Sequence, residues 1–392
     1  MTISPSPQGD RDHRLDIFRG LALMMIFINH VPKNIYEGIT SRNFGFSDAA
    51  EAFVLMSGIA VGLAYSRGFA QSSFFDALLK VWRRAGKIYV THIVITAWAI
   101  AIVAAGIVYF DSTDVLQRVN FTRLLDRPLA SMMGVPLLTH QLGYFNILPL
   151  YFVLLVVSPI YIMIGLRSRL SLVLVAAAIW FVAGSLRLNF PNYPNPGGWF
   201  FNPFSWQLIY AIGIAAGLDA KEGRKLVPYD KVLFMIAAGY LVLSLVWVQF
   251  RLGAFPGSGQ LPFFISGYDK SFVALPRFLH VLALAYVLTN LDAVTRLLST
   301  KPFKPIQLMG QHGLPVFAAG SVIAIALQVL RSRYQTTVLE DGALLMTGIL
   351  LQYGLAVFLS LISPKKKLPA VLPDKAKMQD GVGRPAFASM RK

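Results

Sequence analysis

The chain has 392 residues, of which 55% are hydrophobic and only 14% are charged, whereas about a quarter of the residues of a soluble domain are charged. This composition excludes an ordinary soluble protein and indicates a polytopic membrane protein. The net charge of +17 is scattered between apolar runs and forms no basic face, so we expect no nucleic-acid partner. The chain has no cysteine, which excludes disulfides, zinc–thiolate sites and a thiol nucleophile, and we expect no metal.

Ten apolar segments are long enough to cross a hydrocarbon core of about 30 Å as helices. The even number places both termini on one side of the membrane. Most of the 36 Lys and Arg residues then lie on the side of the termini, which the positive-inside rule assigns to the cytoplasm. We therefore predict an all-α fold with about ten transmembrane helices and cytoplasmic termini. The segments begin near Leu15, Ala49, Ile88, Asn146, Leu170, Phe204, Val232, Ser271, Gln307 and Gly342.

We find no internal repeat and no separate soluble domain. Residues 1–363 are predicted to form one membrane-embedded domain. Its apolar composition implies that membrane lipid surrounds it. Residues 364–392 are polar and begin with the run Lys365-Lys366-Lys367. This segment is predicted to be a disordered cytoplasmic tail that is attracted to anionic lipid headgroups.

The first predicted helix, Leu15 to Val31, carries its ionisable residues on one stripe. At about 100° per residue, Arg19 and His30 share nearly the same azimuth, and Asp16 lies one turn before Arg19. The helical rise separates Arg19 from His30 by about 16 Å, so a cation near one membrane face is linked to an imidazole near the other. The simpler alternative is that Arg19 reaches the headgroups and that His30 only ends the helix.

Two acids mark the start of the second predicted helix. Asp48 and Glu51 are three residues apart and share a helical face. Capping of the helix N-terminus explains Asp48 well, but Glu51 lies deeper. A carboxylate at this position, if it lies near His30, would orient the imidazole and raise its basicity.

Basic residues at the predicted inner start of the third helix have two interpretations. Arg83 and Arg84 either anchor the helix by the positive-inside rule or clamp phosphates, which guanidinium groups hold with paired hydrogen bonds. The roles of four histidines stay open, since each also fits a structural position: His92, His140, His280 and His312. An outer segment rich in Asn, Pro and aromatic residues, 189–204, is either a membrane-interface anchor or a sugar-holding surface.

Several motifs together resemble the OpgC family, a branch of the transmembrane acyltransferase superfamily. The likeness covers nearly the whole chain up to about Ser363, and the opening motif is the most specific. The motifs are Asp12 to Gly20 with Asn29-His30, Phe46 to Glu51 with Ser57-Gly58, Asn146 to Tyr151, Asn202 to Gln207, and Gly310 to Phe317.

The resemblance implies a ten-helix enzyme of the bacterial inner membrane that succinylates osmoregulated periplasmic glucans. The donor would be a cytoplasmic acyl-CoA, specifically succinyl-CoA, and the acceptor a hydroxyl group of the glucan. By matching positions, His30 would be the acyl-transfer base and Arg83 with Arg84 the inner arginine motif. A role for Glu51 is implied only by the OpgC family itself and not by the wider acyltransferase superfamily. Neither the oligomeric state nor the choice between direct transfer and a covalent acyl-enzyme follows from the motifs.

Acyl transfer to a hydroxyl needs a general base and hydrogen-bond donors for the oxyanion. Asn29 is a candidate donor, and Ser57 is a lower-ranked candidate for a serine nucleophile. Arg277, near the outer end of the eighth span, is our candidate for the cation that meets a succinyl carboxylate. The candidate catalytic residues are thus His30, Glu51, Asn29 and Asp16, and the candidate donor-binding residues are Arg19, Arg83, Arg84 and Arg277.

A transporter or flippase of an anionic or glycosylated substrate is the competing class, because it too places charges along a membrane pathway. Inverted symmetry between the two halves would favour transport, and the sequence shows none. Release of free CoA would separate the two classes.

Overall fold

The computed structural model describes residues 13–362 except residues 72, 256 and 335. This part of the chain is helical and contains no strand, only an isolated bridge between Pro191 and Gly198. The predicted all-α class is confirmed. The predicted domain boundary after residue 363 and the tail that follows it lie outside the described residues.

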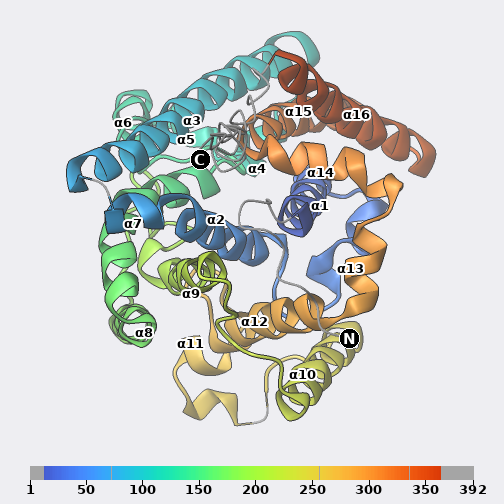
Figure 1. The fold of residues 1–392 in the computed structure, drawn as a ribbon. Helices are drawn as coiled ribbons and strands as arrows, with labels where there is room; N and C mark the ends of the chain where they lie inside the picture. The colour runs from blue at the N-terminus through green and yellow to red at the C-terminus, as the bar shows by residue number, and fades with distance from the viewer. Residues whose placement is uncertain (1–12, 72, 256, 335, 363–392) are drawn as a thin grey trace, which may run out of the picture.

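The helices form a bundle in which α2 and α9 lie in the interior and α3, α7, α8, α10 and α16 surround them (Figure 1). The long helices are α1 (His13–Asn29), α2 (Ala49–Gln71), α3 (Phe74–Phe110), α7 (Ile147–Arg167), α8 (Arg169–Leu186), α9 (Pro203–Lys221), α10 (Lys231–Gln249), α12 (Leu275–Asn290), α15 (Gly313–Arg333) and α16 (Val338–Ile362). The shorter ones are α4 (Val115–Arg118), α5 (Thr122–Asp126), α6 (Pro128–Gly134), α11 (Phe263–Ser266), α13 (Asp292–Leu298) and α14 (Lys304–Gln311).

Seven helices of the described chain are long and apolar enough to cross a membrane, or up to eight if α12 and α13, which meet at 77°, form one broken span. The seven are α2, α3, α7, α8, α10, α15 and α16. Each of the ten predicted segments contains a helix, but the number of ten spans and the side of the termini are not confirmed. Helix α9 has most of its residues buried among other helices, so it need not be as apolar as a lipid-facing helix.

The third helix begins earlier than predicted. The sequence placed its start near Ile88, whereas α3 begins at Phe74 and runs for 37 residues. About 20 residues suffice to cross the hydrocarbon core, so the extra turns extend the helix beyond it. Arg83 and Arg84 therefore lie within a continuous helix.

Close packing of α2 against α9 depends on glycine. Gly58 and Gly62 of α2 face Gly213 and Gly217 of α9, and a Cβ atom at any of the four would collide with backbone of the opposite helix. Small residues spaced four apart allow helices in a membrane to approach to backbone contact. This contact fixes the position of Ser57, which precedes Gly58.

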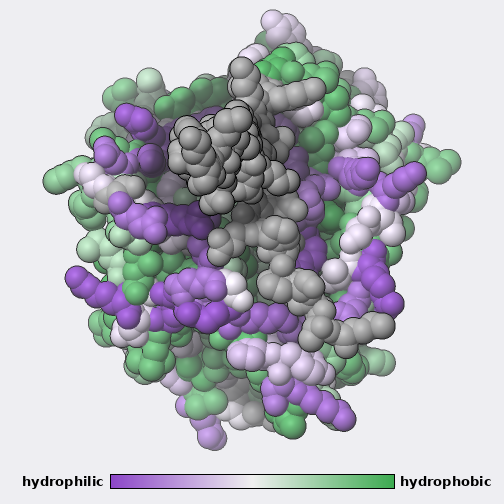
Figure 2. All heavy atoms as spheres, viewed as in Figure 1, coloured by the Kyte–Doolittle hydropathy of each residue, from purple (hydrophilic) through white to green (hydrophobic). Residues whose placement is uncertain are grey.

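The space-filling view of the same face shows hydrophilic side chains gathered across it and hydrophobic side chains along its rim (Figure 2). Large exposed apolar residues on α3, α8, α10 and α16 include Trp98, Phe181, Val242 and Phe358. Exposure of these large apolar side chains to water is unfavourable, so the rim suits a lipid environment.

Candidate functional site

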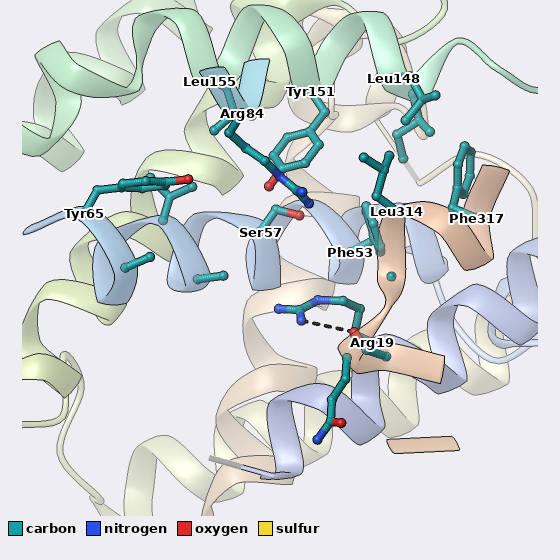
Figure 3. Close-up of a pocket in the computed structure, with 17 residues that line it drawn as sticks. Arg19, Phe53, Ser57, Tyr65, Arg84, Leu148, Tyr151, Leu155, Leu314 and Phe317 are labelled. Atoms are coloured by element: carbon teal, nitrogen blue, oxygen red, sulfur yellow. Dashed lines mark hydrogen bonds between the residues drawn. The ribbon is translucent and has the colours of Figure 1, made fainter. Parts of the chain in front are cut away.

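A cavity of about 180 Å³ lies between α1, α2, α3, α7 and the junction of α14 with α15 (Figure 3). Figure 3 shows Arg84 extending from one wall toward Ser57 and Tyr151, with Arg19 approaching from the opposite wall. Most of the residues that line the cavity are apolar. Polar side chains that line it come from Arg19, Ser57, Tyr65, Arg84, Tyr151 and Gln311.

Of the four predicted donor-binding residues, Arg19 and Arg84 line this cavity, whereas Arg83 and Arg277 do not. The Arg19 Nη1 atom donates to the Asp16 carboxylate over 3.2 Å and to the carbonyl oxygen of Gly310 over 3.4 Å. Asp16 and Arg19, which the sequence places one turn apart on the same stripe of α1, are therefore in contact. Arg84 is half-buried in the cavity wall, whereas Arg83 is exposed and does not line the cavity. Two guanidinium groups facing one cavity suit a ligand that carries phosphates.

His30 follows the last residue of α1 and is held at a separate polar centre. Its ring stacks on that of Tyr144, with 4.4 Å between the ring centroids and 15° between the planes. Its carbonyl oxygen accepts a hydrogen bond of 2.7 Å from Gln328. Lys270 and Asp48 are close enough to act electrostatically on its imidazole. His30 does not line the cavity that contains Arg19.

Glu51 binds Arg277 through short contacts. The Arg277 Nη2 and Nε atoms lie 2.5 Å and 2.8 Å from Glu51 Oε1, and Nη2 lies 3.6 Å from Asp48 Oδ2. Glu51 is 0% exposed, so its charge requires this partner. Arg277, which we predicted to meet a succinyl carboxylate, thus already has a carboxylate partner within the protein. No hydrogen bond between Glu51 and His30 is present in the described structure.

The two acids also form a capping box at the start of α2. Asp48 Oδ1 accepts from the Ala50 N–H over 2.8 Å, and Glu51 Oε2 accepts from the Asp48 N–H over 3.0 Å. The capping role considered for Asp48 is thus confirmed, and Glu51 takes part in it. Each acid caps the helix and binds a cation with the same carboxylate.

Lys270 completes this cluster, and the sequence reading missed it. Its ammonium lies 2.5 Å from Asp48 Oδ2 and about 6 Å from the rings of Phe200 and Phe201. Burial raises the pKa of the Asp48 carboxyl, but Lys270 and Arg277 outweigh it and hold that pKa well below its usual range. Asp48 is therefore ionised. We call Asp48, Glu51, Lys270 and Arg277 the ion cluster.

Asn29, the candidate oxyanion donor, has a fixed orientation. Its Oδ1 atom accepts a hydrogen bond of 2.8 Å from the Thr40 hydroxyl. An amide held through its oxygen presents its NH₂ group in a defined direction. The structure brings Asn29 and His30 together only as chain neighbours.

The other histidines have mostly structural surroundings. His280 Nδ1 contacts the Ser47 hydroxyl at 2.7 Å, and His140 Nδ1 lies 3.4 Å from Asn195 Nδ2. His312 stands at the break between α14 and α15, as its Gly/Pro-rich surroundings predicted. His92 is buried in α3, and neither ring nitrogen has a hydrogen-bond partner in the described chain.

The aromatic segment 189–204 is divided between buried and exposed rings. Trp199 and Phe201 are buried, which excludes their faces as open sugar platforms, whereas Tyr193 and Phe200 are exposed. Phe200 and Phe201 lie beside Lys270, so this segment contacts the ion cluster.

Comparison with protein families decides the family of the chain. The family model described as OpgC protein matches residues 11–363, which include both the cavity and the ion cluster. The chain belongs to the OpgC family. We find no match to it among curated proteins or among solved structures.

Membership of the OpgC family gives the chain an acyltransferase-type role on glucans, in a membrane context and with an acyl-CoA donor. Among the described residues, no group of three or more His, Asp or Glu side chains is placed to hold a metal ion. In this OpgC protein, the candidate catalytic and donor-binding residues lie at the cavity, at His30 and in the ion cluster.

Proposed function

We propose that the protein is an O-succinyltransferase of the bacterial inner membrane, with both termini in the cytoplasm. It takes the acyl group from cytoplasmic succinyl-CoA and transfers it to hydroxyl groups of a periplasmic glucan. The observation that carries this proposal is the placement of Arg19, which lines the cavity, about three turns of α1 before His30, which follows the last residue of the helix. The rise of the helix separates them by about 16 Å, so a donor held at Arg19 can present its thioester toward His30 without crossing the bilayer.

At the donor end, Arg19 and Arg84 bind the phosphates of CoA. Each guanidinium offers several N–H donors in a fixed plane, which match phosphate oxygens. Asp16 holds Arg19 in place through its 3.2 Å hydrogen bond, so it positions the donor without touching it. Tyr65, Tyr151 and Gln311 supply further hydrogen-bonding groups in the same walls.

Arg84→Ala should raise the KM for acyl-CoA by about tenfold or more, with a smaller change in kcat. The lost hydrogen bonds are made to phosphates remote from the reacting carbon, and bonds to charged groups are the stronger kind. Titration of acyl-CoA against CoA release measures both constants. Arg83→Ala is the matched control, because Arg83 is the adjacent arginine of the same helix but is exposed. Equal effects of the two substitutions would mean that these arginines act only on membrane topology.

At the acceptor end, His30 acts as the general base. The imidazole takes the proton of the glucan hydroxyl as its oxygen attacks the thioester carbon. The C–S bond then breaks, and the proton passes to the CoA sulfur as CoA leaves. The stacked ring of Tyr144 fixes the imidazole plane, and the Asp48 carboxylate favours the imidazolium that forms, whereas the Lys270 ammonium opposes it. The Asn29 amide is a hydrogen-bond donor for the oxyanion.

The ion cluster supplies the cation for the free carboxylate of a succinyl group. Arg277 is already paired with the fully buried Glu51, whereas Lys270 has the more exposed side chain and a more exposed partner, Asp48. We therefore assign the carboxylate to Lys270. Binding of the carboxylate draws the Lys270 ammonium away from Asp48, which remains close to His30.

Purified protein supplied with a glucan should release free CoA from succinyl-CoA much faster than from acetyl-CoA. A transporter moves its substrate without cleaving a thioester, so the release of CoA separates the two classes. Lys270→Gln should reduce succinyl transfer by about 10- to 100-fold and acetyl transfer much less, because only succinyl loses a charged hydrogen bond. Efficient acetyl transfer by the unmodified protein would refute the succinyl assignment, and equal losses in the variant would refute the role of Lys270.

A further inference from the structure

One buried face of α15 runs from the cavity to His30. Leu314 and Phe317 of this helix line the cavity. Residues three, four and seven apart share a helical face, so Ser321 continues this face beyond the cavity and Gln328 follows two turns later. Gln328 lies at the His30 end of this face, because its Nε2 atom donates to the His30 carbonyl over 2.7 Å.

Two polar atoms on this face have no hydrogen-bond partner in the described chain. They are the hydroxyl oxygen of Ser321, which is 3% exposed, and the Oε1 atom of Gln328, which is 1% exposed. A buried polar atom is unfavourable without a partner, and most such atoms in proteins have one. Thr96 and His92 of the adjoining helix α3 also carry buried polar atoms without a partner. Buried polar atoms without a partner thus lie between the cavity and His30, and a polar ligand bound there would satisfy them.

We propose that Ser321 binds an amide group of the pantetheine arm of the acyl-CoA donor. This inference rests on the proposed function. The arm links the phosphates of CoA to the sulfur and contains two secondary amides, each with an N–H and a carbonyl that need partners inside a membrane protein. A donor with its phosphates at Arg19 and Arg84 and its thioester at His30 must lay this arm along the route that α15 borders.

The position of Ser321 selects one of the two amides. Ser321 is seven residues before Gln328, which places it about 10 Å nearer the cavity along the helix. The amide next to the sulfur lies at the His30 end, beside Gln328. Ser321 therefore meets the amide that is further from the sulfur. A hydroxyl can accept from the amide N–H or donate to its carbonyl, so either orientation of the amide is satisfied.

Thioesters of different length test this assignment with the same acyl group. Acyl-CoA and acyl-pantetheine contain both amides, whereas an N-acetylcysteamine thioester keeps only the amide next to the sulfur. Ser321→Ala should lower kcat/KM about three- to tenfold for the first two donors and leave the third unchanged. Ser244→Ala is the control: it removes a buried hydroxyl that already donates to the Leu241 carbonyl over 2.8 Å, and it should affect none of the donors.

The outcomes separate this inference from the function on which it rests. Equal losses for all three donors, or an unchanged kcat/KM with acyl-CoA, overturn the assignment of Ser321. In either case, CoA release by the unmodified protein still supports acyl transfer. If the unmodified protein releases no thiol from any of the donors, the proposed function is refuted, and the role of Ser321 with it.

Discussion

His30→Ala should lower acyl-transfer turnover by about 10²- to 10⁴-fold, the usual contribution of a positioned general base. The side chain is half-buried and stacks on Tyr144, and its contact with Gln328 is made by the main chain, which the substitution keeps. The variant should therefore insert and fold, so the loss reports on chemistry. Single-turnover CoA release at saturating acyl-CoA and glucan measures it.

His13→Ala is the control for this experiment. His13 is the first residue of the same helix, is exposed, and contacts Gln307 through its ring. Its replacement removes an imidazole from α1 at the end opposite to His30 and should leave turnover unchanged. Turnover of the His30 variant close to that of the unmodified protein would remove His30 from the mechanism.

Local periodicity was enough to predict the features that depend on neighbours in the sequence. The Asp16–Arg19 pair follows from a spacing of three on a helix, and the cap of α2 follows from the spacing of Asp48 and Glu51. Apolar length and Gly/Pro breaks likewise indicated the helices, including the break at His312. Such features need no knowledge of how the helices pack.

The pairs that join distant segments could not be predicted in this way. Arg277 and Glu51 are 226 positions apart, and Lys270 lies 222 positions from Asp48. No rule of spacing links such residues, because their contact depends on the packing of α12 and its preceding loop beside α2. For the same reason, the sequence did not predict that Tyr144 and Gln328 lie beside His30. The start of α3 was predicted too late because Gly86 and the basic residues around it were read as a break, whereas the helix continues through them.

Arg277→Gln should destabilise the folded protein by about 3–5 kcal/mol, the usual cost of removing one partner from a buried ion pair. Glu51 is fully buried, and Arg277 contacts it through two nitrogen atoms, so the substitution leaves a carboxylate in the protein interior without its main partner. Thermal unfolding of the purified protein in detergent measures the loss. Activity toward succinyl and acetyl donors should fall together, since the defect lies in the fold and not in recognition of one acyl group.

Glu51→Gln in the same chain should restore most of this stability, because the double variant replaces an unpaired charge with two neutral amides that can bind each other. Arg42→Gln provides the matched control. Arg42 pairs with Glu37 over 3.1 Å at an exposed site, where an ion pair contributes at most about 1 kcal/mol, so its loss should hardly shift unfolding. If the double variant is no more stable than Arg277→Gln alone, the guanidinium does not act by compensating Glu51. Recovery of stability without recovery of acyl transfer would instead show that the ionised Glu51–Arg277 pair also serves the reaction beside His30.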